Sequence, residues 1–269
     1  MSLLDRILAS KRAEIAHARA SRRVTSSRRP LNVFGVLGRP GGTPLRLIAE
    51  VKMKSPSAGE LSRALDAPSR ALSYAKAGAA MVSVLCDRPF FDGSWQDLEA
   101  TRARLDAQGH TVPLLAKEFI LDEVQIELAR DHGADAVLLI ARILSDDDLV
   151  RLAAHARGLN LEPLVEISDE GELDRALAAE ARAIGVNARD LDSLAIDPAR
   201  AARVLAAIPK ELVAVHLSGL SSPDAVRAVA AGRADAALVG EALMREDDPA
   251  PLLTRMVSAC GAGESEPKK

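Results

Sequence analysis

Eight short apolar runs alternate with longer amphipathic stretches from Leu45 onward, and this alternation constrains the fold more than any other feature. The runs cover residues 45–52, 80–86, 112–119, 136–143, 161–167, 183–190, 211–219 and 236–243. Many of the stretches between them begin with Ser or Asp, which cap helices, and end near Gly, which often follows a helix. Repeated units of roughly 25–30 residues, each a buried strand and then a helix, predict eight parallel strands closed into a (β/α)₈ (TIM) barrel.

An open doubly wound sheet is the alternative fold for such a pattern. That fold usually has a glycine-rich phosphate loop after its first strand, whereas residues 50–60 read EVKMKSPSAGE. The length of 269 residues matches one barrel of about 250 residues. The chain is 48% hydrophobic but only 2% aromatic, and such aliphatic composition suits helices packed around a buried parallel sheet. We therefore predict the barrel.

Three segments are expected along the chain. They are an N-terminal helical extension and linker over 1–44, the barrel over 45–260 and a flexible tail over 261–269. The spacing of apolar residues near the start indicates an amphipathic helix, with Leu4, Ile7, Leu8 and Ile15 on one face. The basic segment 21–30 has two interpretations, a solvated linker or a mobile flap near an anionic ligand.

Charge and composition exclude several classes of partner. The chain has 35 basic and 38 acidic residues, and with few aromatics it offers neither a basic surface nor stacking platforms for nucleic acid. No apolar run approaches the ~20 residues that span a bilayer. Charges are interleaved from the first residues, unlike a signal peptide, so we expect a cytoplasmic protein. The sequence does not fix the oligomeric state, and a monomer is the working expectation.

Polar residues that close the apolar runs are the candidates for chemistry. In barrel enzymes the active site lies at the carboxyl ends of the strands, and polar groups within strand bodies are costly to bury. The residues that meet this condition are Glu50, Lys52, Lys117, Glu118, Arg142, Glu166, Asn187, Arg189, Asp190, His216 and Ser218.

Strand alternation narrows this set. Glu50 and Lys52 share one face of their strand, and Lys117 and Asn187 fall on equivalent faces of theirs. If these faces point into the barrel mouth, they and Glu166 form a site for acid–base chemistry on a polar substrate. No His, Cys and carboxylate cluster has metal-ligand spacing. The alternative is a set of ion pairs that seals the barrel, although burying several unmatched charges for stability alone is usually unfavourable.

The last two strands indicate an anion site. Gly219 ends one strand and Gly240 opens a short helical segment after the other. The loops after the seventh and eighth strands form the recurrent phosphate pocket of this fold. Backbone N–H groups of Ser218, Gly219, Gly240 and Glu241 are the expected donors. The alternative is that both glycines only shape turns.

Seven segments together resemble a known family. They are IAEVKMKSPSAG, SVLCDRPFFDGS, LLAKEFI, ADAVLLI, EPLVEI, GVNARDL and LVGEALM, preceded by LLDRILASKRAEI. In order and spacing they are similar to the motifs of indole-3-glycerol phosphate synthases, from about residue 3 to about residue 257. The resemblance implies a reaction of tryptophan biosynthesis. In it, 1-(2-carboxyphenylamino)-1-deoxyribulose 5-phosphate becomes indole-3-glycerol phosphate, CO₂ and water, with no cofactor and no metal.

The resemblance also implies roles. Lys117 would be the general acid of ring closure, and Lys52 would hold the substrate carboxylate and assist proton transfer. Glu50 and Glu166 would orient the lysines and exchange protons, with Asn187 on substrate hydroxyls. Residues that match the phosphate and hydroxyl region are Lys54, Ser57, Arg189, Ser218, Gly219, Gly240 and Glu241. Residues that match the anthranilate pocket, or belong to an ordinary core, are Phe91, Phe119, Leu138 and Leu191.

One position departs from the family. Where its members usually have Glu-Ser-Gly, this chain has Leu217-Ser218-Gly219, with His216 one residue earlier. Alternation aims His216 and Leu217 to opposite sides, so the histidine replaces the glutamate only in a bulged strand and otherwise packs between strand and helix. The missing carboxylate points to lower turnover or an altered substrate. The alternatives are another phosphosugar barrel, such as a ribose-phosphate isomerase, or a weakly active paralogue that binds phosphosugars or a partner protein.

The two cysteines are expected to be structural. Cys86 and Cys260 give no disulfide framework. Cys86 ends an apolar run with no obvious base beside it, which indicates a packed thiol rather than a nucleophile.

Overall fold

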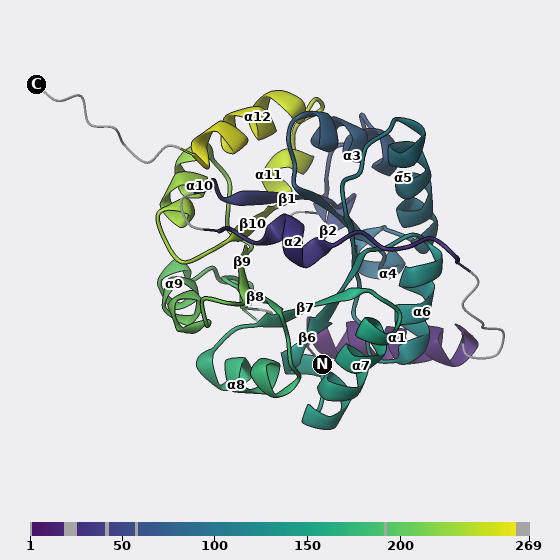
Figure 1. Cartoon of the computed structure of the whole chain (residues 1–269). Helices are drawn as coiled ribbons and strands as arrows, with labels where there is room; N and C mark the ends of the chain where they lie inside the picture. Colours follow the sequence, from purple (N-terminus) through teal and green to yellow (C-terminus); the bar gives the residue numbers. More distant parts are fainter. Residues whose placement is uncertain (1, 19–25, 41–42, 57–58, 191–192, 262–269) are drawn as a thin grey trace, which may run out of the picture.

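Eight parallel strands form a closed barrel at the centre of the molecule (Figure 1). The computed structural model describes residues 2–18, 26–40, 43–56, 59–190 and 193–261. The barrel strands are β1 (Arg46–Val51), β4 (Met81–Leu85), β5 (Leu114–Lys117), β6 (Ala136–Ile140), β7 (Glu162–Ile167), β8 (Ala183–Asn187), β9 (Val213–Leu217) and β10 (Ala236–Val239). Each lies within one of the eight apolar runs, and the predicted (β/α)₈ barrel is confirmed. A small antiparallel hairpin, β2 (Lys54–Ser55) with β3 (Gly59–Glu60), follows the first barrel strand.

An outer ring of helices covers the barrel (Figure 1). Its members are α3 (Ala67–Lys76), α5 (Trp95–Ala107), α6 (Glu123–Asp131), α7 (Asp146–Gly158), α8 (Glu170–Ala178), α9 (Pro198–Ala207), α10 (Pro223–Ala230) and α12 (Ala250–Ala259). From α3 to α10, each begins after an Asp or Ser whose side chain accepts a backbone N–H of the first turn. Each such cap contributes about 1 kcal/mol, so the helix starts follow from local sequence. Short helices α4 (Arg88–Phe91) and α11 (Glu241–Met244) and a 3₁₀ turn (Ala141–Ile143) follow three of the strands.

Alternating side chains divide the core into two shells. Inside the barrel, Ile48, Leu115 and Leu217 belong to one apolar cluster. Outside it, Ala49 and Val51 belong to a second cluster between strands and helices. Because side chains alternate between the two faces, the sequence pattern predicts which side chain points into the barrel at the carboxyl end of each strand.

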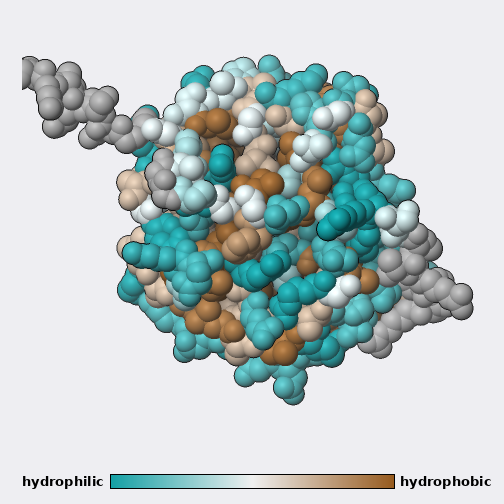
Figure 2. All heavy atoms as spheres, viewed as in Figure 1, coloured by the Kyte–Doolittle hydropathy of each residue, from teal (hydrophilic) through white to brown (hydrophobic). Residues whose placement is uncertain are grey.

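The chain before the barrel crosses the opposite end. In Figure 1, helix α2 (Val33–Leu37) lies in front of the barrel strands. Its Val33 and Leu37 belong to the inner apolar cluster together with the first residues of several strands, among them Ala136 and Val213. Figure 2 shows apolar residues near the middle of this face with hydrophilic residues around them. Helix α2 therefore closes the amino-terminal end of the barrel.

The described part of the basic segment, residues 26–30, is anchored at this same end. Arg28 contacts the Asp135 carboxylate at 2.6 Å, and the Leu31 N–H donates to the same oxygen at 2.7 Å. Asp135 is fully buried and directly precedes β6. The interpretation of this segment as a flap near the ligand is therefore wrong for residues 26–30, whereas residues 21–25 lie outside the described part.

Helix α1 (Leu3–Ala18) packs beside α6. The division of the chain at 44/45 and 260/261 stays a prediction, and most of the expected tail, 262–269, lies outside the described residues. Within the part that is described, no helix is long and apolar enough to cross a membrane.

Asp135→Ala is expected to destabilise the protein by about 3–5 kcal/mol, because it leaves buried cations and backbone donors without their carboxylate. The affected groups are the partly exposed Arg28, the buried Arg102 at 3.6 Å, the Leu31 N–H and the Leu114 N–H, which donates to the second carboxylate oxygen at 2.8 Å. Urea unfolding followed by circular dichroism measures the change. The exposed Asp147→Ala is the control, and equal midpoints for the two variants would contradict the anchoring role.

Candidate active site

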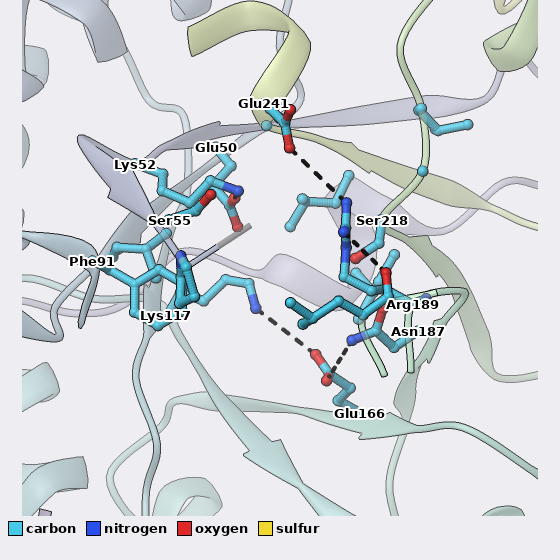
Figure 3. A pocket seen from close by; sticks show the side chains of 18 of the residues that line it. Glu50, Lys52, Ser55, Phe91, Lys117, Glu166, Asn187, Arg189, Ser218 and Glu241 are labelled. Atoms are coloured by element: carbon cyan, nitrogen blue, oxygen red, sulfur yellow. Dashed lines mark hydrogen bonds and ion pairs between the residues drawn. The ribbon is translucent and has the colours of Figure 1, made fainter. Parts of the chain in front are cut away.

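A cavity of about 490 Å³ opens at the carboxyl ends of the strands (Figure 3). Five candidate residues from four strand ends line it, namely Glu50, Lys52, Lys117, Glu166 and Asn187. Glu50 lies near the end of β1 with Lys52 just beyond it, Lys117 and Asn187 are the last residues of β5 and β8, and Glu166 is in β7. The structure thus brings together side chains that the sequence separates by up to 137 positions.

Lys117, Glu166 and Asn187 form a continuous chain of interactions. The Lys117 Nζ lies 3.8 Å from Glu166 Oε2, and Asn187 Nδ2 donates to Glu166 Oε1 at 2.9 Å. Asn187 Oδ1 in turn accepts the Arg189 N–H at 3.0 Å, which fixes the amide orientation. Glu166 is buried, while the Lys117 side chain keeps 21% of its surface exposed toward the cavity. A cation with a buried carboxylate behind it is suited to donate a proton and recover it.

Lys52 and Glu50 form a second pair at 3.1 Å between Nζ and Oε1. The backbone carbonyl of Glu50 accepts a hydrogen bond from the Tyr74 hydroxyl at 3.3 Å. Burial raises the pKa of Tyr74, so the phenol stays protonated and donates. The Glu50 carboxylate also lies over Gly240, where an added Cβ would stand 2.5 Å from Oε1. Glycine at 240 therefore leaves the space that this carboxylate occupies.

The predicted phosphate region lies on the strand-end loops of β8, β9 and β10. Arg189, Ser218, Gly219, Gly240 and Glu241 all line the cavity. Ser218 and Gly219 have φ angles of 70° and 82°, which makes a sharp left-handed turn directly after β9. Figure 3 shows Arg189 directed toward Glu241, with 4.0 Å between guanidinium nitrogen and carboxylate oxygen. Arg245 approaches the other oxygen of this carboxylate at 2.7 Å, so two cations flank it.

Several predicted residues do not line the cavity, among them His216 and the pair Arg142–Asp190, whose side chains lie 3.2 Å apart. Lys54 is exposed on the β2–β3 hairpin and does not line it. Ser57 and Leu191 lie outside the described residues.

The apolar end of the cavity contains the predicted aromatic pair. Phe91 and Phe119 pack with ring centroids 6.0 Å apart at 35°, and Leu138 of β6 lies in the same lining. Sequence reasoning missed the contribution of α1, whose Leu3, Leu4 and Ile7 complete this wall. Their helical spacing was visible, but nothing local indicated which surface they cover.

The structure of strand β9 shows where Leu217, which replaces the glutamate usual in the family, and the neighbouring His216 point. The register Val186↔His216 and Asn187↔Leu217 continues without a bulge to the strand end. Leu217 points into the cavity, against Gly185, whereas His216 does not line it. The His216 Nε2 lies 3.0 Å from the Ser218 carbonyl, and burial lowers the pKa of the imidazole. His216 therefore does not replace the missing carboxylate, and Nε2 of the neutral ring donates to the carbonyl.

Both cysteines are buried free thiols, and burial raises the pKa of each, as expected for packed residues. Among the described residues, no group of three or more His, Cys, Asp or Glu is placed to hold a metal ion.

Fold and cavity together define a (β/α)₈ enzyme with acid–base groups on its strand ends. Comparison with known proteins specifies the class further. The family model described as indole-3-glycerol phosphate synthase matches residues 4–256. The chain belongs to this family, and the resemblance drawn from its motifs is confirmed.

Curated relatives match over nearly their whole length. The indole-3-glycerol phosphate synthase of Paenarthrobacter aurescens is 38% identical over 97% of this chain and 98% of its own. That of a Nocardioides species is 41% identical over 95% and 98%. Among solved structures, a 3-hexulose-6-phosphate synthase superposes with a TM-score of 0.61 at 18% identity, covering 80% of this chain and 99% of its own. At that identity the likeness shows the fold alone.

The buried imidazole of His216 is expected to make stability fall as the pH is lowered. The folded-state pKa lies below the ordinary 6.5, so the unfolded chain takes up a proton near pH 6.5 while the folded chain does not. Urea midpoints at pH 7.5 and 5.5 should therefore differ less in His216→Gln, which keeps an N–H for the Ser218 carbonyl. All other titrating groups are present in both proteins, so the difference isolates His216. Equal pH slopes would contradict this assignment.

Proposed function

We propose that this protein is a carbon–carbon lyase of tryptophan biosynthesis. It converts 1-(2-carboxyphenylamino)-1-deoxyribulose 5-phosphate to indole-3-glycerol phosphate, CO₂ and water. The observation that carries the proposal is the placement of Lys117 beside Glu166 in one cavity with the Lys52–Glu50 pair. Family membership supplies the substrate, and these two pairs supply the acid and base groups that its conversion needs.

Ring closure requires a general acid. The ring carbon that bears the carboxylate attacks the C2 carbonyl of the ribulose chain, and the carbonyl oxygen gains negative charge. Lys117 protonates this oxygen as the C–C bond forms. The neutral amine then regains a proton from solvent, and the Glu166 carboxylate beside it favours the charged ammonium. A positioned acid of this kind contributes roughly 10²–10⁴-fold to the rate.

Decarboxylation and dehydration follow on the same framework. Closure leaves an iminium within the substrate, which accepts the electron pair of the breaking C–CO₂ bond. Lys52 holds the carboxylate until it leaves as CO₂. Loss of water then needs an acid for the hydroxyl and a base for the ring proton, and the remaining carboxylate and ammonium groups of the two pairs provide both kinds of group.

The two ends of the cavity suit the two ends of this substrate. Phe91, Phe119 and Leu138 offer an apolar slot for the anthranilate ring. At the other end, Arg189 and the turns at Ser218–Gly219 and Gly240–Glu241 face the phosphate, with Asn187 beside the hydroxyl groups. Because the apolar slot and the phosphate region lie at opposite ends of the cavity, they hold the substrate with its reacting atoms beside Lys117 and Lys52.

A second candidate function is favoured by Leu217. An apolar side chain there leaves one substrate hydroxyl without the usual carboxylate, which suits a phosphosugar-binding barrel of weak or altered activity. Substrate binding without product formation would identify it.

A cytoplasmic location and a monomeric state stay predictions from the sequence. Light scattering of the purified protein tests the monomer.

Lys117→Ala is expected to lower kcat by about 10²–10⁴-fold, because the general acid is lost. Indole fluorescence follows product formation from the carboxyphenylamino-ribulose phosphate. The thermal midpoint should stay near that of the native protein, and Lys76→Ala, at an exposed lysine, is the matched control. Equal activity of Lys117→Ala and the native protein would exclude Lys117 as the acid. No product from the native protein would overturn the lyase assignment.

A further inference from the structure

A lysine lies within the buried stripe of helix α1. The buried residues of this helix are Ile7, Lys11 and Ile15, spaced four apart on one face. The Lys11 side chain is only 1% exposed, although lysine is almost never fully buried unless it is paired. Its apolar stem continues the stripe, and its ammonium must be stabilised by what lies opposite.

Three carboxylates surround that ammonium. The Nζ lies 2.8 Å from Glu14 Oε2, 2.9 Å from Asp87 Oδ2 and 3.1 Å from Glu118 Oε2. Asp87 and Glu118 are themselves buried, whereas Glu14 is 46% exposed. The cluster therefore joins α1 to two segments that follow β4 and β5, and Glu118 is 107 positions away in the sequence.

Each buried carboxylate uses its other oxygen to hold an aromatic residue of the cavity. Asp87 Oδ1 accepts the N–H groups of Phe90 and Phe91 at 2.8 and 3.2 Å, and so caps α4. Glu118 Oε1 accepts the Phe119 N–H at 2.7 Å. Lys11 thus contacts the two groups that fix the backbone of Phe91 and of Phe119, the pair at the apolar end.

Helix α1 is also part of that end. Leu3, Leu4 and Ile7, one to two turns before Lys11, line the same cavity. An isolated apolar contact between α1 and the barrel would let the helix slide, whereas one ammonium held by two carboxylates from different segments fixes its position.

We propose that Lys11 is a positioning residue that locks α1, Phe91 and Phe119 into one wall and so shapes the binding slot for the aromatic ring of the substrate. This inference rests on the proposed function for the identity of that ring. Lys11 itself does not line the cavity, so it acts through Asp87 and Glu118.

Electrostatics explains why the lysine is needed. Burial raises the pKa of Glu118 to about 7 against the opposing attraction of Lys11, and Asp87 adds to the rise. Burial lowers the pKa of Lys11, but Glu118, Glu14 and Asp87 outweigh it, and the net shift is upward. Another titratable group close by is the Cys86 thiol, whose pKa is raised by burial and by Glu118 and Asp97.

Loss of Lys11 leaves Asp87 and Glu118 facing each other without a cation. Glu118 then stays protonated to higher pH, and one negative charge remains. Above that range both carboxylates are ionised and repel, which pulls the Phe91 and Phe119 segments apart. The defect therefore grows with rising pH.

The test is the pH dependence of KM in Lys11→Met, which keeps the length and apolar stem of the side chain. At pH 9 its KM should exceed that of the native protein about tenfold with kcat within about threefold, since binding rather than proton transfer is affected. At pH 6 the KM ratio should fall to about two, because Glu118 is protonated. The exposed Lys76→Met serves as the matched control and should match the native protein at both values.

A double variant distinguishes a positioning role of Lys11 from a role in stability alone. In Lys11→Met/Glu118→Gln the repelling pair is absent, so the KM ratio should no longer depend on pH. A purely structural role predicts a lower thermal midpoint with an unchanged KM ratio, and that result would overturn the proposal.

Amide hydrogen exchange tests the same inference without activity. Lys11→Met should raise exchange at the Phe91 and Phe119 amides, whose acceptors are Asp87 and Glu118, and unchanged protection would overturn the proposal. Failure of the native protein to form product would instead count against the proposed function and leave this readout valid. If Lys11→Met does not fold, the double variant, which lacks the repelling pair, should fold and keep the Phe91 amide nearly as protected as in the native protein. Loss of that protection would overturn the proposal.

Discussion

The closed barrel forces every second side chain of each strand inward, and the site depends on this constraint. Inner positions of the strand bodies are largely apolar, as at Ile48 and Leu115, and charged side chains follow near the carboxyl ends, as at Glu50 and Lys117. A polar group at that layer meets the cavity rather than the core, so its desolvation is incomplete. Two cations and two carboxylates therefore meet where the barrel interior ends, and the apolar layer beneath keeps their side chains directed toward the mouth.

Much of this was predictable because the rules are local. Strand positions, helix caps and the inward direction of Lys117 and Asn187 follow from short-range periodicity, and the structure places them accordingly. Family motifs added roles that geometry alone does not assign. At Leu217 the same alternation rule indicated what the structure shows, since a regular β9 directs leucine inward and His216 outward.

What could not be predicted depends on contacts between distant segments. The burial of Lys11 requires Asp87 and Glu118 from two other parts of the chain, and no local signal pairs them. The lysine within the stripe of Ile7 and Ile15 was the available clue, because a charge at that spacing demands partners. Lys54 shows the reverse case, in which a motif residue is carried on a hairpin away from the cavity lining.

Helix α2 has a consequence for the order of events in turnover. Its Val33 and Leu37 close the amino-terminal end of the barrel. The inner apolar cluster fills the space between this helix and the charged side chains at the carboxyl ends of the strands. Among the residues described, passage is thus left to the mouth alone. Substrate, CO₂, water and indole-3-glycerol phosphate all pass through the same mouth of the active site. A new substrate molecule can therefore enter only after the product has left.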